Sequence, residues 1–204
     1  INFLIRACGG MLAGLLWRPL WRRYFLLVVV EVFAVVMLFR FMPAVQNRFV
    51  KQFIEQLPTD TESSYAKAML PGIEAFHFAP ISGIGPGNFR DLCEDIVAGR
   101  SGLVCHPHPH NFYVQLLGET GAIGFILGSI FLGSIVWACF SANLKNRQNV
   151  FVATAWVVPF GLFWPIASTA DFFGQWNNIF LWSAVGVALS ATSLRTQVDN
   201  LASR

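Results

Sequence analysis

The sequence predicts an all-α integral membrane protein, the C-terminal portion of a polytopic helical bundle that carries one large, partly helical loop outside the cytoplasm. Hydrophobic residues make up 55% of the chain and charged residues only 12%, against about 25% charge in a typical soluble domain. Several apolar stretches are long enough to cross a bilayer core of about 30 Å. Short basic connections also alternate with one long acidic segment, which indicates a defined orientation in the membrane.

About five membrane segments are expected. The first, residues 1–17, resembles the end of a helix that starts in a preceding part of the protein, because no initiating Met or signal peptide precedes it. Full spans are expected over 24–42, 120–140, 150–170 and 172–194. The corresponding domains are 1–42 with the truncated helix, an Arg-rich turn and one span, 43–119 as the loop domain, 120–194 with three spans, and 195–204 as a cytoplasmic tail.

The placement of charges predicts which side of the membrane each connection occupies. Lys and Arg accumulate in short cytoplasmic connections, and here the short connections carry Arg18, Arg22, Arg23, Lys145, Arg147, Arg195 and Arg204. The segment 43–119 is rich in acids and should lie outside the cytoplasm. This topology accounts for the net charge of +3, so no nucleic-acid partner is expected.

Arg6 and Glu31 are charged residues that fall deep inside expected membrane segments, whereas Arg40 lies near the outer end of its span, where snorkelling is expected. Arg6 lies on the order of 16 Å from the cytoplasmic turn if the segment is helical. It is either a snorkelling residue at a helix end or a buried cation that receives an anionic ligand. Glu31 lies in the middle of the span 24–42, and a structural partner on another helix is favoured for it because an acid would repel a phosphate.

The long external segment contains two predicted helices and a glycine-rich turn. Apolar residues recur at helical spacing over 49–57 and again over 65–78. Residues 80–89 read Pro-Ile-Ser-Gly-Ile-Gly-Pro-Gly-Asn-Phe. Because no strand precedes these glycines, a tight turn is favoured over a dinucleotide-binding loop. Cys93 and Cys105 follow on the same external side, where an oxidising compartment allows a disulfide, and the sequence leaves open whether they pair.

Three histidines precede the span 120–140. His106, His108 and His110 alternate with prolines that favour extended backbone, and Asn111 is suited to cap the helix that follows. A neutral imidazole has the pKa of a general base at physiological pH. A metal-binding module is a rival interpretation, since alternate residues of an extended strand share a face, whereas in a polyproline turn they diverge.

Two motifs in this region resemble those of the O-antigen ligase and polymerase family of bacterial envelope enzymes. The first is His-Asn, nine residues and Gly-x-x-Gly, met by residues 110–124, and the second is Pro-x-x-Gly-x-Gly-x-Gly-Asn-Phe, met by residues 80–89. Family members often carry an Arg about fifteen residues before that Pro. Here the position falls near Tyr65, and Lys67 or Arg48 are the available substitutes.

The resemblance implies a metal-independent, inverting glycosyltransferase without a cofactor. It would move a glycan from an undecaprenyl-diphosphate carrier to an acceptor hydroxyl on the periplasmic face of the bacterial inner membrane. The acceptor would be a lipid A core, a growing glycan or a protein, so ligase, polymerase and protein oligosaccharyltransferase all remain open. A non-enzymatic transporter of lipid-linked glycans is a further alternative.

The residues expected to carry this reaction lie in the motifs or in the first membrane segment. His110 is expected to be the general base, although a helix-start His that only bonds a backbone carbonyl is the structural alternative. Arg6 and Arg90 are the expected diphosphate contacts, because guanidinium groups bind phosphate oxygens through paired hydrogen bonds. The expected substrate-binding set is completed by Asn111, His108 and Glu119.

Overall fold

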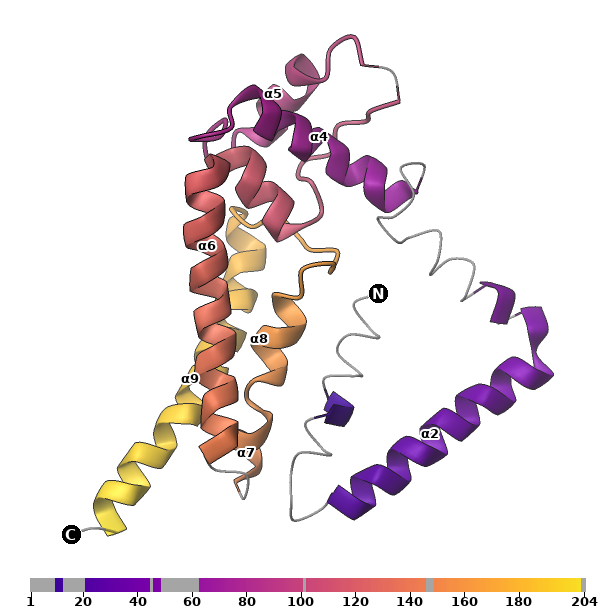
Figure 1. Cartoon of the computed structure of the whole chain (residues 1–204), viewed down its shortest axis with the longest axis vertical. Coiled ribbons are helices and arrows are strands. Elements are labelled where there is room, and N and C mark those ends of the chain that lie inside the picture. Colours follow the sequence, from indigo (N-terminus) through magenta and orange to yellow (C-terminus); the bar gives the residue numbers. More distant parts are fainter. Residues whose placement is uncertain are drawn as a thin grey trace. The chain divides into compact units, whose positions relative to one another are not determined.

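The computed structural model describes residues 10–12, 21–44, 46–48, 63–100, 102–145 and 149–202, and all regular structure in these ranges is helical (Figure 1). The chain forms two compact units. One comprises Asn47–Leu132 and Pro165–Ile179, and the other comprises Gly133–Trp164, Phe180–Arg204 and the segment up to Gln46. The predicted helix at 49–57 and most of the segment 1–17 lie outside the described residues.

Helix α2, Trp21–Phe41, coincides with the predicted span 24–42. Its 21 residues correspond to a length of about 30 Å at 1.5 Å per residue, which matches a bilayer core. Large apolar side chains such as Phe33 and Val36 are exposed along it. Glu31 is exposed as well. A structural partner for Glu31 and a membrane location for this helix stay predictions.

Helix α4, Ser64–Phe78, confirms the helix predicted over 65–78. It begins where Ser63 Oγ accepts a hydrogen bond from Ala66 N at 3.0 Å, which satisfies one of the free amides at a helix start. The short helix α5, Phe89–Ile96, packs against it. The core between them consists of Ala75, Phe89, Cys93 and Val97.

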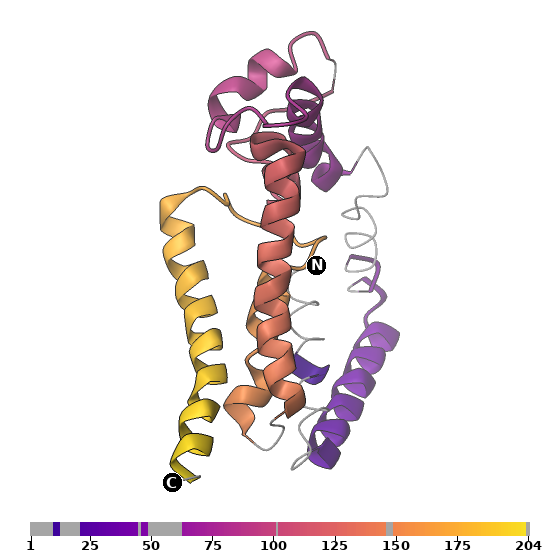
Figure 2. The same ribbon diagram turned by 60° about the vertical axis from the view of Figure 1, so that its left-hand side comes forward.

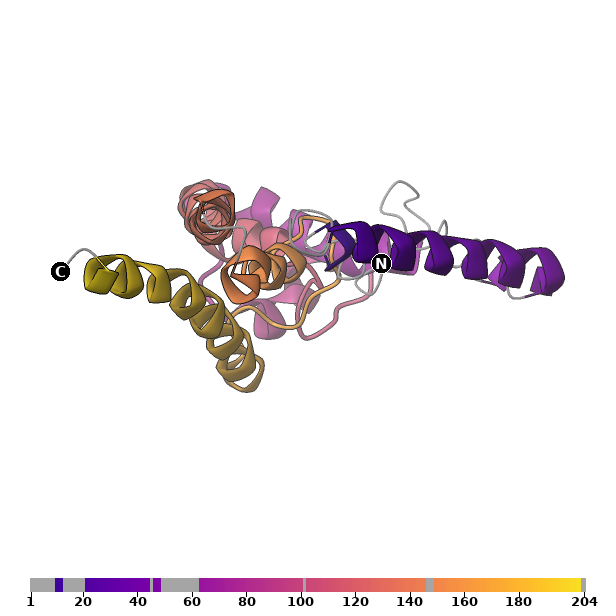
Figure 3. The same cartoon turned by 90° about the horizontal axis from the view of Figure 1, so that it is seen from below.

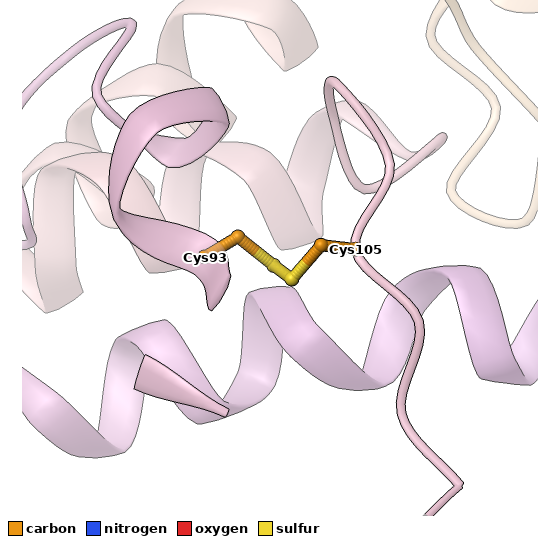
Figure 4. Close-up of a disulfide and its surroundings, with 2 residues drawn as sticks. All are labelled: Cys93 and Cys105. Carbon is orange, nitrogen blue, oxygen red and sulfur yellow. A yellow bond between two sulfur atoms is a disulfide. The ribbon is translucent and has the colours of Figure 1, made fainter. Parts of the chain in front are cut away.

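Cys93 and Cys105 form a disulfide, with their Cα atoms 5.9 Å apart (Figure 4). Cys93 lies on α5 and is buried in the core against α4. Cys105 lies in the loop directly before His106. The bond therefore joins the loop that carries the three histidines to the helix that carries Arg90.

Helix α6, Phe112–Lys145, is interrupted at Gly121, whose φ of 65° and ψ of −168° are not helical. The chain thus forms a short helical segment over 112–120 and a long one over 122–145, which meet at an angle visible in Figure 1. Among the described residues, α6 is the one helix long and apolar enough to cross a membrane. The predicted span 120–140 falls almost entirely in its second segment.

The glycine-rich turn at 80–88 supplies the hydrogen bonds that the break removes. Ile84 N donates to Gly118 O at 3.1 Å and Gly85 N to Glu119 O at 2.9 Å, at the end of the first segment. Ala122 N donates to Pro80 O at 2.9 Å, at the start of the second segment. Helix ends leave backbone groups without partners, and here one turn satisfies both ends, so the two sequence motifs fold as one structural feature.

The span expected over 150–170 is not a single helix. Helix α7, Val150–Thr154, is followed by α8, Val157–Leu162, and the chain is not helical from Phe163 to Gly174. Pro165 cannot donate the hydrogen bond that a continuing helix would need. The carbonyl groups that follow α8 bind side chains of Tyr65 and Asn111 instead of amides of a helix.

Helix α9, Gln175–Ala202, begins slightly later than the predicted span 172–194 and extends beyond it. Figures 2 and 3 show it as one uninterrupted helix. Cys139 of α6, Trp156 and Ala188 of α9 form the buried core of their unit. The ring of Trp156 meets Phe140 and Phe160 edge-on, at centroid distances of 5.7 and 5.3 Å, a favourable geometry for aromatic pairs.

The break at Gly121 generates a stability prediction. A Cβ at this residue would lie 2.6 Å from Gly83 N and needs a positive φ, so Gly121→Ala should add overpacking of roughly 1–3 kcal/mol to backbone strain of about 1–2 kcal/mol. Gly99→Ala is the control, because its φ is 80° but a Cβ there meets nothing within 4 Å. Thermal unfolding of the detergent-solubilised protein should show a clearly larger loss for Gly121→Ala, and equal losses would contradict the packing role.

Candidate active site

The rings of the three histidines form a cluster just before the start of α6. The His108 and His110 ring centroids are 4.3 Å apart, and those of His106 and His110 are 5.3 Å apart. His110 has a left-handed backbone with φ of 55°, which is uncommon for a residue with a side chain. Pro109 is buried, and a Cβ at Gly72 of α4 would lie 2.9 Å from it. The loop is therefore seated on α4 immediately before His110.

Asn111 caps α6, as the sequence predicted. Its Oδ1 accepts hydrogen bonds from Tyr113 N at 3.0 Å and Val114 N at 3.1 Å. Its Nδ2 donates to Pro165 O at 2.7 Å and Ala167 O at 3.3 Å. Asn111 is only 2% exposed, so its amide joins the helix start to the non-helical segment after α8. Contact of this side chain with substrate stays a prediction.

Tyr65 of α4 also binds where Asn111 joins the start of α6 to the segment after α8, a contact region that we call the junction. Its hydroxyl donates to Ala167 O at 2.9 Å and accepts a hydrogen bond from Asn111 Nδ2 at 3.2 Å. The same segment is held a little further on, where Thr169 N donates to His110 O at 2.8 Å. The segment 165–169 is thus fixed beside His110 by two side chains and one backbone hydrogen bond.

A series of buried side-chain hydrogen bonds continues along the first segment of α6. Gln115 Nε2 donates to Glu119 Oε1 at 2.8 Å and to Asp171 Oδ1 at 2.7 Å, and its Oε1 accepts from Phe172 N at 2.8 Å. Glu119 Oε2 accepts a short hydrogen bond from Gly87 N in the glycine-rich turn. Asp171 Oδ2 faces the guanidinium of Arg90 at 3.8 Å.

The environment of His108 and His110 favours the neutral form of each. Burial lowers the pKa of His110 below the ordinary 6.5, and the charges of His108 and His106 lower this pKa further. Burial also lowers the pKa of His108, against the opposing effects of Asp171 and a backbone hydrogen bond with Thr169. A neutral imidazole has a free acceptor nitrogen at physiological pH, which is the state a general base needs.

Glu119 has the opposite shift. Burial raises the pKa of this carboxyl, and the nearby charge of Asp171 raises it as well, while hydrogen bonds from Gln115 and Gly87 lower it. The side chain is 1% exposed. Two charged carboxyl groups held near each other away from water repel. The Gln115 amide donates a hydrogen bond to each of them and so reduces this repulsion.

The compact unit that contains residues 47–132 and 165–179 brings together His108, His110, Asn111, Glu119 and Arg90. Arg6 lies outside the described residues. Arg48 is exposed, and Lys67 is half-buried. Tyr65 itself belongs to the buried junction described above.

Three residues of this site were missed by the sequence analysis: Tyr65, Gln115 and Asp171. A signal for Gln115 exists in the sequence, because Asn111, Gln115 and Glu119 recur every four residues and so share one face of a helix. No local pattern marks Asp171 as a partner of that face. Its segment is brought to α6 by the tertiary fold.

Among the described residues, no group of three or more His, Cys, Asp and Glu side chains has a geometry that could hold a metal ion. The histidine rings instead contact one another edge-on or tilted. The metal-binding interpretation receives no support from this arrangement.

The apolar composition and the membrane-length helix α6 are typical of a helical membrane protein. The chain belongs to the O-antigen ligase family, whose profile matches residues 3–129. Both sequence motifs lie within the match. No curated protein and no solved structure matches the chain significantly. Membership implies a membrane protein that transfers lipid-linked glycans in a ligase-type or polymerase-type reaction.

The double role of Asn111 can be tested against an exposed asparagine at the start of another helix. Asn149 accepts hydrogen bonds from Phe151 N and Val152 N at the start of α7 and is exposed, so Asn149→Ala should cost about 0.5–2 kcal/mol. Asn111→Ala should cost about 1–3 kcal/mol more, because it also removes a donor from buried carbonyls. Thermal unfolding of both variants checks this, and a smaller loss for Asn111→Ala would show that the junction is not needed for stability.

Proposed function

We propose that this chain carries the catalytic part of a glycosyltransferase that moves a glycan from an undecaprenyl-diphosphate carrier to an acceptor hydroxyl on the periplasmic face of the inner membrane. The observation that carries the proposal is His110, whose imidazole is kept neutral by burial and by its neighbouring histidines. It lies at the head of α6, the helix long and apolar enough to cross the bilayer. A lipid-linked diphosphate places its reacting carbon near such a membrane surface.

The proposed reaction is a single displacement. The acceptor oxygen attacks the anomeric carbon while His110 removes the hydroxyl proton, and the bond between that carbon and the diphosphate oxygen breaks. The diphosphate departs with the electron pair, and the configuration at the sugar inverts. General-base catalysis contributes about 10²–10⁴-fold in rate, and no metal or cofactor takes part.

Arg90 is proposed to bind the departing diphosphate. It lies on α5, its side chain is 65% exposed, and its guanidinium is paired with Asp171 only at 3.8 Å. It is therefore available for the bidentate hydrogen bonds that arginine makes with phosphate oxygens. Its charge lowers the pKa of His108, which supports a position near the histidine cluster. Arg6 is retained as a second proposed contact.

The acceptor decides between a ligase acting on a lipid A core, a polymerase and a protein oligosaccharyltransferase, and all three use the same proposed base. A transporter of lipid-linked glycans would need no general base. The histidine cluster and the lowered pKa of His110 therefore favour the enzyme over the transporter.

The test of this function is His110→Ala in the full-length protein, reconstituted with its lipid-linked glycan. Turnover should fall by about 10²-fold or more, since the base acts in the chemical step, while the affinity for the lipid-linked donor should change little. Transfer of glycan to acceptor and binding of the donor are measured separately.

His77→Ala is the matched control, because His77 is an exposed histidine on α4 that pairs with Glu74 at 3.7 Å outside the cluster. Its turnover should equal that of the unmodified protein. Full activity of His110→Ala would refute the proposed mechanism, and intact lipid transport with no glycan transfer in the unmodified protein would favour the transporter.

His108 should also affect the acid limb of the pH–activity profile, that is, the range in which turnover falls as the pH is lowered. The base must be neutral, so turnover is lost as pH falls through the His110 pKa, which lies below 6.5. His108→Asn removes a neighbour whose protonated form lowers the pKa of His110, and the smaller side chain leaves His110 less buried, so both effects raise that pKa. The limb should therefore move to higher pH, whereas His77→Asn should leave it in place. A limb that does not move in His108→Asn would show that another group titrates.

A further inference from the structure

We propose that Gln115 is a positioning residue for the diphosphate contact, in that its amide sets the place of Arg90 by holding Glu119 and Asp171 together. This inference rests on the proposed function of Arg90. Gln115 is 1% exposed and lies in the first segment of α6, so it acts through its neighbours and does not itself meet the substrate.

The orientation of the Gln115 amide is defined by three hydrogen bonds. Its oxygen accepts from Phe172 N at 2.8 Å, and this leaves the NH₂ group directed at the two carboxylates, Glu119 at 2.8 Å and Asp171 at 2.7 Å. An amide nitrogen has two hydrogens, so each carboxylate receives one. A glutamate at this position would offer no such pair of donors, and a leucine would offer none.

The two carboxylates connect Gln115 to both sides of the start of α5. Glu119 accepts from Gly87 N in the turn that leads into this helix. Asp171 faces the guanidinium of Arg90 on the helix itself. Because Asp171 Oδ1 is occupied by Gln115 and by Phe173 N at 3.0 Å, Oδ2 is left to face the arginine.

The same amide fixes the segment that contacts His110. Its bond to Phe172 N holds one end of this segment, and the bond from Thr169 N to His110 O lies three residues earlier in the chain. A partly exposed ion pair such as Arg90 with Asp171 contributes little to stability. The role assigned to Gln115 is therefore to position Arg90, and weaker donor binding by a variant that still folds is the expected result.

A double-mutant cycle between Gln115 and Arg90 tests this in the full-length protein in detergent, with undecaprenyl diphosphate as the binding probe. Gln115→Leu should weaken binding by about tenfold, and Arg90→Ala by at least as much. The double variant should bind no more weakly than Arg90→Ala alone, because residues that act through one another are not additive. Gln115→Glu, which nearly preserves the shape, should give the same result and provides a second variant if Gln115→Leu fails to fold.

Arg100 supplies the matched control, since it is an exposed arginine that pairs with Glu74 of α4. Combining Gln115→Leu with Arg100→Ala should give only the loss seen in Gln115→Leu. If Arg90→Ala weakens binding and Gln115→Leu weakens it further in that background, the positioning role is overturned while the proposed function stands. If Arg90→Ala binds normally, the diphosphate role of Arg90 is wrong, and the inference is overturned with it.

Discussion

The hydrogen-bonding requirement of a broken helix is the constraint on which this structure depends. At Gly121 the path of α6 turns, and backbone groups on both sides lose their helical partners. The glycine-rich turn 80–88 supplies new partners to both ends, and the close approach of Gly83 to Gly121 leaves no room for side chains. The break separates a short segment that carries polar residues from a long apolar one of membrane length.

The same requirement explains the non-helical segment that follows α8. A chain without helical hydrogen bonds must find other partners when it is buried, and here Tyr65, Asn111, Gln115 and the His110 carbonyl supply them. Each of these contacts also places the segment beside the histidine cluster. The polar groups that stabilise the junction are thus the ones that shape the candidate site.

Charge is distributed in the candidate site so that a neutral imidazole, His110, and a partly exposed guanidinium, Arg90, lie in one compact unit. Burial and mutual repulsion lower the pKa of His110. In the same unit, the carboxyl groups of Glu119 and Asp171 are bound by the Gln115 amide, and they also contact Gly87 N and Arg90 respectively. This arrangement is the one that the proposed reaction needs, in which a base takes up a proton and a diphosphate leaves.

Much of this protein follows from its sequence alone, because local rules decide it. Helical spacing predicted α4, and the capping preference of Asn identified the start of α6. The two motifs, considered together, indicated the family, and the predicted external location of Cys93 and Cys105 left a disulfide open. These features depend on residues that are neighbours in the chain.

The tertiary structure decided what depends on distant partners. The apolar stretch 150–170 reads as one span, but its carbonyl groups after α8 bind Tyr65 and Asn111, which lie about a hundred and about fifty residues away in the chain. The partnership of Gln115 with Asp171 was likewise invisible, since no periodicity links a helix face to a separate irregular segment. Such contacts are chosen by the burial of polar groups in the folded chain, a condition that local sequence does not contain.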